Sequence, residues 1–260
     1  MRFASIGSGS SGNGTLIKGA GACLLVDCGF SLKETRKRLA RLGLDAEDLS
    51  GLLVTHGHRD HISGVGVLAR AYDLPVWMTV GTQKECQQAN IGRLSDVQLF
   101  YSNEAFAIDG LEIESFPVPH DAREPSQFVF SDDSFRVGLL TDTGSSTKHI
   151  ERVLSGCDAL LLECNHDMDL LMAGDYPLAL KQRVSSQYGH LDNITAGQIL
   201  SKIDCSKLQH LVAMHLSQKN NRPELARDAL SVAMECEQQW IKVADQDAGL
   251  AWCELKLKKG

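Results

Sequence analysis

The chain has 260 residues, 43% of them hydrophobic and 23% charged, and a formal net charge of −7. It has no apolar run of about 18 residues that could span a membrane, and its acidic balance counts against a protein that coats nucleic acid non-specifically. The N-terminal stretch "MRFASIGSGSSGNG" lacks the apolar core of a signal peptide. We therefore expect a soluble, cytoplasmic protein that folds as a single domain over residues 1–260.

The first part of the chain alternates short apolar runs with helical patterns. Residues 31–43 predict a helix, because Ser31 is a suitable N-cap with Glu34 three residues on, and Gly43 is a suitable C-cap. Strands are predicted at 1–6, 15–19, 22–27, 51–55 and 75–80, and further helices at 64–72 and 82–89.

The middle of the chain is rich in strand patterns, at 97–101, 111–118, 127–131 and 135–141, with turn sequences at 108–110 and 132–134. The last part alternates again, with strands at 159–164, 210–216, 240–244 and 251–257 and helices near 147–154, 176–186, 194–203 and 223–235. The middle hairpins have antiparallel patterns, and both halves of the chain carry helices. This pattern favours an α/β fold, a four-layer α/β/β/α sandwich, over one doubly wound sheet.

Eight cysteines are scattered along the chain without any C-x-x-C pair. Such spacing indicates neither a zinc knuckle nor a dithiol redox motif. In a cytosolic protein we expect them to be reduced and to pack as small buried hydrophobic residues.

Three short basic segments stand out against the acidic average, at 33–41, 181–183 and 219–222. The plain interpretation is a solvated helix face, above all for the first segment. The alternative is that they guide a polyanion toward a site. The charges alone leave both interpretations open.

The segment "THGHRDH", residues 55–61, places four potential metal ligands directly after a predicted buried strand. A lone histidine is more often a satisfied polar group than a ligand, but four donors in six residues reverse that expectation. His56 and His58 can hold one ion while Asp60 and His61 turn toward a second. Imidazole and carboxylate ligands suit zinc, manganese or iron, and a pair of such ions is typical of displacement chemistry.

Further donors occur where other predicted strands end. Asp27, His120, Asp142 and His215 each follow or close an apolar run. Strand ends lie at the rim of a sheet, where loops build sites. These residues are therefore candidates for the same metal site.

The order of these motifs resembles the five-motif pattern of the metallo-β-lactamase superfamily over nearly the whole chain. The resemblance implies that the first ion is bound by His56, His58 and His120, and the second by Asp60, His61 and His215. It also implies that Asp142 bridges the two ions and that Asp27 orients the His-x-His loop by hydrogen bonding.

Three polar segments are candidates for substrate contact. The turn "SGSSGNGT" at 8–15 can offer backbone N–H groups to a phosphate, although a plain β-turn is the alternative. "LLECNHD" at 161–167 is too polar to be only a turn, and "SQYGHLDN" at 186–193 places His190 before a helix whose predicted N-cap is Asn193. The expected substrate-binding residues are Ser8, Ser10, Ser11, Asn13, Asn165, His166, His190 and Asn220.

Together with "HLSQKNNRPELA", these segments resemble the YycJ/WalJ-type branch of the superfamily, cytoplasmic bacterial proteins regarded as 5′-to-3′ DNA exonucleases. The resemblance implies a phosphodiesterase with two divalent ions, in which a hydroxide held by both ions attacks phosphorus in line. The segment between Asp142 and His215 is too short for the β-CASP insertion of the larger nucleic-acid-processing relatives.

We expect Asp60 and His190 to act in catalysis, with His190 as general acid or phosphate ligand and Asn165 and His166 as rival candidates. The expected partner is DNA, with RNA as the alternative nucleic acid. Two other classes stay open. One is a small-molecule metallo-hydrolase acting on a cyclic phosphodiester, a lactone or a thioester, and the other is an iron-dependent redox or binding protein. The basic segments discriminate only weakly among these.

Overall fold

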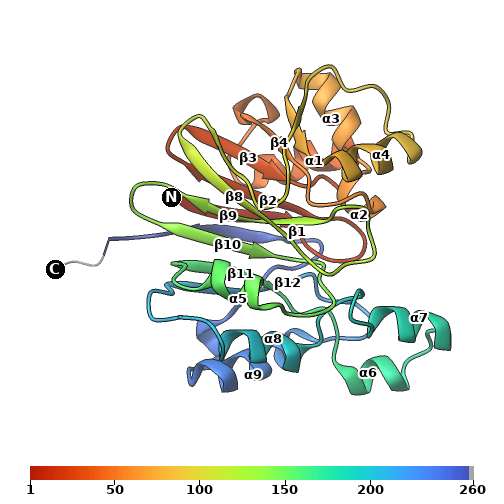
Figure 1. Cartoon of the computed structure of the whole chain (residues 1–260), viewed down its shortest axis with the longest axis vertical. Helices are drawn as coiled ribbons and strands as arrows, with labels where there is room; N and C mark the ends of the chain where they lie inside the picture. Colours follow the sequence, from red (N-terminus) through yellow and green to blue (C-terminus); the bar gives the residue numbers. More distant parts are fainter. Residues whose placement is uncertain (258–260) are drawn as a thin grey trace.

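A computed structural model describes residues 1–257 and places two β-sheets face to face between two layers of helices (Figure 1). This arrangement is the expected four-layer α/β/β/α sandwich, and the expected α/β class is confirmed. In spatial order the first sheet contains β14 (Leu250–Glu254), β1 (Arg2–Gly7), β2 (Gly14–Gly19), β3 (Ala22–Val26), β4 (Gly51–Leu53), β5 (Val76–Met78) and β6 (Val97–Leu99).

The second sheet is built from the later part of the chain. In spatial order it contains β13 (Lys242–Val243), β12 (His210–Met214), β11 (Ala159–Glu163), β10 (Arg136–Leu140), β9 (Ser126–Ser131), β8 (Leu111–Pro117) and β7 (Ala105–Ile108). The strands from β7 to β10 pair antiparallel, and those from β10 to β13 pair parallel. In the first sheet β14, β1, β2 and β3 are antiparallel neighbours, whereas β3 to β6 are parallel.

Helices cover the outer face of each sheet (Figure 1). On the first sheet these are α1 (Leu32–Arg41), α3 (Val65–Tyr72) and α4 (Val80–Gln88), with the short α2 (Arg59–Ile62) beside them. On the second they are α5 (Lys148–Leu154), α8 (Asn193–Leu200) and α9 (Pro223–Met234), while α6 (Met168–Ala173) and α7 (Leu178–Val184) extend from one end. Two 3₁₀ turns occupy Ala46–Asp48 and Gln238–Trp240.

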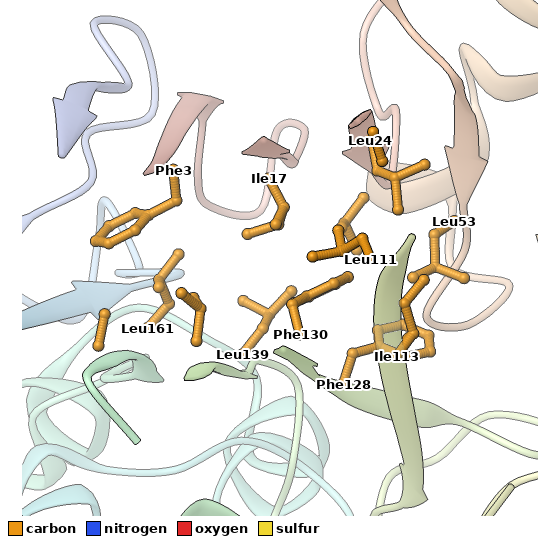
Figure 2. Packing of buried hydrophobic residues seen from close by; sticks show 14 of the residues in the cluster. Phe3, Ile17, Leu24, Leu53, Leu111, Ile113, Phe128, Phe130, Leu139 and Leu161 are labelled. Carbon is orange, nitrogen blue, oxygen red and sulfur yellow. The ribbon is translucent and has the colours of Figure 1, made fainter. Parts of the chain in front are cut away.

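The main core lies between the two sheets (Figure 2). Phe3 and Ile17 of the first sheet face Phe128, Phe130 and Leu161 of the second, and all five side chains are fully buried. Burying side chains of this size stabilises a fold by roughly 1.5–3 kcal/mol each before conformational entropy is counted. Separate apolar clusters lie between each sheet and its helices. The strand ends that carry polar residues are therefore mounted on a rigid scaffold.

Several predicted boundaries shift, each for a local reason. Ser31 caps α1 as predicted, accepting a hydrogen bond from the Glu34 N–H, but the C-cap is Leu42, and Gly43 follows it with a φ of +70°. The predicted cap of α8 at Asn193 is wrong. Asp192 is the N-cap, because its carboxylate accepts from two backbone N–H groups of the first turn.

Three elements were not predicted, namely α2, α6 and β7. Both helices have at most six residues, too few for a helical period to show in the sequence. Strand β4 ends at Leu53, two residues before the predicted end, because the chain then turns into the histidine-rich loop.

The cysteines are all unpaired, and six of the eight are buried, whereas Cys205 and Cys236 are half-buried. Burial raises the pKa of Cys28 to about 11 and that of Cys86 to about 12, so these thiols stay protonated at neutral pH. Among residues 1–257 no helix is both long and apolar enough to cross a membrane.

Candidate metal centre

Six strand ends meet at one edge of the sandwich. Strands β3 and β4 run parallel in the first sheet, and β10, β11 and β12 run parallel in the second, so their carboxyl ends share an edge. Strand β8 runs the same way, because it is separated from β10 by one antiparallel neighbour. The polar residues at these ends are Asp27, His56, His120, Asp142, Glu163 and His215.

The loop after β4 folds back on itself and enters α2, with His58 as the N-cap of that helix. His56 and His61 are fully buried, whereas Asp60 is partly exposed. The loop lies directly against residue 29, where a Cβ atom would overlap the carbonyl oxygen of Asp60, so only glycine fits. The close approach of these two segments brings the donors of the loop together.

Candidate ligand atoms gather in overlapping groups, and within each group they lie within 4.8 Å of one another. One group is formed by three histidines and another by one aspartate and two histidines, and Asp142 takes part in the two groups beside them. The groups are His56, His58 and His120; Asp60, His61 and His215; His56, His61 and Asp142; and Asp142, Glu163, His190 and His215.

The contacts inside this cluster suit a cation better than a hydrogen-bond network. His215 Nδ1 lies 2.9 Å from an Asp142 carboxylate oxygen, yet both ring nitrogens of His215 lack a hydrogen bond of acceptable geometry. His56 Nε2 is likewise buried without a partner. Buried polar atoms without partners are costly. Nitrogen and carboxylate donors that converge in this way fit divalent zinc, manganese or iron.

A buried aspartate and threonine hold the loop in place. Asp27 accepts hydrogen bonds from the Thr55 N–H at 2.9 Å and from the Thr55 hydroxyl at 2.8 Å, and its second oxygen also lies 2.8 Å from His61 Nδ1. The Thr55 hydroxyl lies 3.0 Å from His56 Nδ1. These contacts leave Nε2 of His56 and of His61 facing the cluster. Residues that hydrogen-bond to metal ligands usually orient the ligating imidazole in this way.

Glu163 and His190 form a second polar pair beside the cluster. Glu163 is fully buried, its Oε1 lies 2.7 Å from His190 Nδ1, and its Oε2 accepts the Thr143 N–H. Burial alone would favour the neutral imidazole, but the charge of Glu163 raises the pKa of His190. The His190 side chain keeps an exposed fraction of 21% and faces the open side of the cluster.

The cluster opens into a cavity of about 330 Å³. One side consists of ligand candidates, and the opposite side comes from α7 and the segments that flank it. Two arginines take part, one from each side. The lining residues are Ser10, His58, Arg59, Asp60, Asp121, Asp142, Tyr176, Leu180, Arg183, Val184, Gly189, His190 and His215.

A family model described as the beta-lactamase superfamily domain matches residues 23–216. The chain is 37% identical over 237 residues to the exodeoxyribonuclease YycJ of Bacillus anthracis, covering 90% of this chain and 89% of that protein. It is 35% identical over 229 residues to the exodeoxyribonuclease WalJ of Streptococcus pneumoniae, covering 87% and 85%. The chain belongs to the beta-lactamase superfamily.

The fold agrees with this membership. The crystal structure of the metallo-β-lactamase fold protein YhfI from Bacillus subtilis superimposes with a TM-score of 0.75 at 19% identity, covering 97% of this chain and 98% of that one. The chain is thus a hydrolase of the metallo-β-lactamase fold, and the family expected from the motifs is confirmed. The residue-by-residue roles that the family pattern implies stay predictions.

The glycine- and serine-rich loop at residues 8–15, which joins β1 to β2, supports the cluster from the side of the first sheet. Asn13 Nδ2 lies 3.2 Å from an Asp60 carboxylate oxygen, and Ser8 Oγ accepts the His215 N–H at 2.8 Å. Ser10 lines the cavity, and Ser11 is exposed next to it. Two of these four predicted residues therefore contact candidate ligands, whereas Ser10 alone among them lines the cavity.

Three other predicted substrate residues lie beneath the surface. Asn165 is buried and donates to the His215 carbonyl at 3.1 Å, so it supports the loop after β12. His166 and Asn220 are also buried and are not among the cavity-lining residues. The structure thus places Asn165, His166 and Asn220 behind the site, and only His190 of the later segments lines the cavity.

Three of the strand ends at this edge have left-handed backbone, as do seven other non-glycine residues among residues 1–257. Asp27, Asp142 and His215 have φ angles of +62°, +48° and +54°. For residues other than glycine the left-handed region costs roughly 1–2 kcal/mol per residue. Three such residues at the ends of β3, β10 and β12 indicate that side-chain placement at this site outweighs local stability.

Opposite charges shape the cluster. Burial lowers the pKa of His56 well below its ordinary value, with His61 as a further cause. For Asp60, burial acts in the opposite sense, but His61 and His215 lower the pKa of this carboxyl well below its usual range. Burial would lower the pKa of His61 and of His215, but Asp142 and the neighbouring carboxylates raise both well above the ordinary value. The carboxylates are therefore balanced by positive charge on neighbouring imidazoles, a charge that a bound cation could supply instead.

From the sequence, Thr55 and Arg59 had no assigned role, Glu163 was expected only as part of the polar segment 161–167 that could contact substrate, and Arg183 only as part of the basic segment 181–183. Glu163 ends the apolar strand β11 in the same way as Asp27 follows β3, so the signal at strand ends was available for it. Arg59 carried no such signal, and the basic segment 181–183 did not by itself place Arg183 at the site, because only the folded chain brings α2 and α7 to one cavity.

Proposed function

We propose that this hydrolase is a two-metal phosphodiesterase that degrades DNA from an end, as a 5′-to-3′ exodeoxyribonuclease. The observation that carries the proposal is the arrangement of the donor residues. Two three-residue donor groups lie beside a cavity that also contains two arginines, and Asp142 belongs to the two remaining groups. The names of the relatives that cover most of this chain support DNA as the substrate.

His56, His58 and His120 would hold one ion, and Asp60, His61 and His215 the other, with Asp142 shared. Zinc, manganese or iron would satisfy these donors. Bound there, two divalent ions supply Lewis-acid stabilisation of the charge that develops on the phosphoryl oxygens and orient the displacement in line. Asp27 and Thr55 would keep the histidines of the loop oriented to hold the ions.

His190 is suited to move a proton at the leaving oxygen. Its Nδ1 faces Glu163, which sets the tautomer, so Nε2 is the nitrogen available to the cavity. His190 packs edge-on against His120 and His215 with ring centroids 5.2 Å and 5.3 Å away, so it sits directly beside the candidate ligands. Glu163 acts as a positioning residue, because it reaches the substrate only through His190.

The side chains of Arg59, Arg183 and Ser10 around the cavity suit an anionic diester. A free carboxylate in the same place would repel that substrate, but Asp121 is paired with Arg183. The remaining carboxylates of the cavity, Asp60 and Asp142, belong to the donor groups.

The direct test compares three substrates in parallel, with Mn²⁺ and with Zn²⁺. These are 5′-labelled duplex DNA, single-stranded RNA and bis-p-nitrophenyl phosphate. We expect stepwise release of 5′-terminal nucleotides from DNA. Hydrolysis of the small diester alone would overturn the nuclease proposal and favour the small-molecule hydrolase.

The role of His190 is tested by His190→Ala, which should lower turnover at least tenfold. General acid–base catalysis typically contributes roughly 10²–10⁴-fold to a rate. Metal content should stay unchanged. His210→Ala is the matched control, because His210 lies at the opposite end of β12 from His215. Full activity of His190→Ala would remove this residue from the mechanism.

A further inference from the structure

The wall that faces the metal cluster comes from the arm formed by residues 168–188, which includes α6 and α7. Figure 1 shows both helices extending from the body at the end where α2 lies. From this arm Tyr176, Leu180, Arg183 and Val184 line the cavity. The reaction proposed above uses none of these four side chains for chemistry, so their role lies in binding.

One lysine lies near the aromatic ring of this wall, and an arginine lines the same cavity. Arg183 pairs with Asp121, and one Asp121 oxygen lies 3.6 Å from His58 and from His120, so the arginine is tied to the cluster. Lys219 Nζ lies 5.5 Å from the centroid of the Tyr176 ring. Two of the basic segments recognised in the sequence therefore reach this wall, 219–222 at the Tyr176 ring and 181–183 through Arg183 in the cavity.

An aromatic ring beside cations is the usual arrangement for single-stranded nucleic acid. Bases stack on the ring, and the cations follow the phosphates. Arg59 completes the arrangement from the opposite side, since it is exposed on α2 and makes no ion pair within residues 1–257. An aromatic ring beside these cations distinguishes the cavity from a site that binds only a phosphate.

The cavity has room for a single nucleotide. Its volume of about 330 Å³ is at the lower end of the roughly 300–1,000 Å³ that small-molecule sites span. Enzymes that bind a single base taken from a duplex must first unpair it.

We propose that Tyr176 stacks on the base of the terminal nucleotide while Arg59 and Arg183 bind the adjoining phosphates, so that a DNA end is accepted only after its last base pair has opened. This inference rests on the proposed exonuclease function. It adds that the substrate in the cavity is an unpaired strand end.

The test uses two 5′-labelled duplexes of the same length that differ only in the terminal pair, which is matched in one and mismatched in the other. For the natural enzyme kcat/KM should be severalfold higher on the mismatched end, because unpairing costs least there. Tyr176→Ala should raise KM about tenfold or more, the loss expected for one stacked base. Tyr176→Phe should keep KM near the natural value.

Tyr188→Ala is the matched control. Tyr188 belongs to the same arm and its exposed fraction is 61%, but it is not among the residues that line this cavity. KM for Tyr188→Ala should therefore stay within twofold of the natural value. Metal content and melting temperature of each variant show whether its fold is intact, and the comparison of the two duplexes needs no variant at all.

Equal kcat/KM on the two duplexes would overturn the inference, as would equal KM for Tyr176→Ala and Tyr188→Ala. In both cases DNA is still degraded, so the exonuclease proposal survives. Failure of the natural enzyme to degrade either duplex, with bis-p-nitrophenyl phosphate hydrolysed, would instead overturn the proposed function itself.

Discussion

The cavity has two sides of opposite physical character. The ligand side is buried, and His56, His61 and Asp142 are almost completely shielded from solvent and contact one another or a bracing residue. The arm side is exposed, with an exposed fraction of 59% for the Arg183 side chain. A desolvated cluster must be fixed in place to compensate its charges, whereas an exposed wall can vary. The first side therefore determines the reaction, and the second determines which substrate reaches it.

The largest effect should follow a change on the ligand side. Asp142→Asn removes a charge that lies 3.1 Å from His61 Nε2 and 2.9 Å from His215 Nδ1. Bound metal should fall below the natural stoichiometry, and turnover should fall by more than the roughly 10–100-fold that loss of a ligand's partner costs. Elemental analysis and turnover of the purified variant check this. Asp133→Asn, an exposed carboxylate, is the control, and full metal content in Asp142→Asn would contradict the prediction.

A smaller effect should follow a change one contact away. Asp27→Asn leaves every candidate ligand in place but weakens the bracing of His61 and Thr55. We expect metal affinity to fall about 10–100-fold, measured by competition with a chelator, and turnover to recover when metal is in excess. If affinity stayed at the natural value, Asp27 would have no influence on the ligand side.

A still smaller effect is expected on the arm side. Arg183→Ala should raise KM for DNA severalfold and lower the slope of log affinity against log salt by about one, because one phosphate contact is lost. Metal content should not change. Arg152→Ala, an exposed arginine on α5 outside the cavity, is the matched control. Loss of metal from Arg183→Ala would show that the two sides are not independent.

The smallest effect concerns stability. Leu178, at the start of α7, has an exposed fraction of 69%. Leu178→Ala should change the free energy of unfolding by less than about 0.5 kcal/mol, whereas Phe128→Ala, in the core between the sheets, should cost roughly 3–5 kcal/mol. Denaturant titrations of both variants check the contrast. A large loss in the free energy of unfolding for Leu178→Ala would contradict the prediction and mean that Leu178 is packed as tightly as the core.

Most elements of the fold could be predicted because their hydrophobic periods are local. The strand that precedes the histidine-rich loop and the helix capped by Ser31 depend on neighbours within a few residues. The sequence shows no helical hydrophobic period at residues 59–62 and 168–173, because each helix is only one or two turns long. Their positions depend on packing at the edge of the sandwich.

The sequence by itself determined the family and the set of candidate donors. A contiguous motif, "THGHRDH", carries four of them, and the other three follow strands, so their residue types and spacing were sufficient. Only the tertiary structure decided which polar residues face the cavity. It placed Asn165, His166 and Asn220 behind the site, paired Glu163 with His190, and brought Arg59 and Arg183 together. The physical reason is that side-chain direction at a strand end depends on the local φ angle and on the elements packed around it, and neither is written in the sequence near that residue.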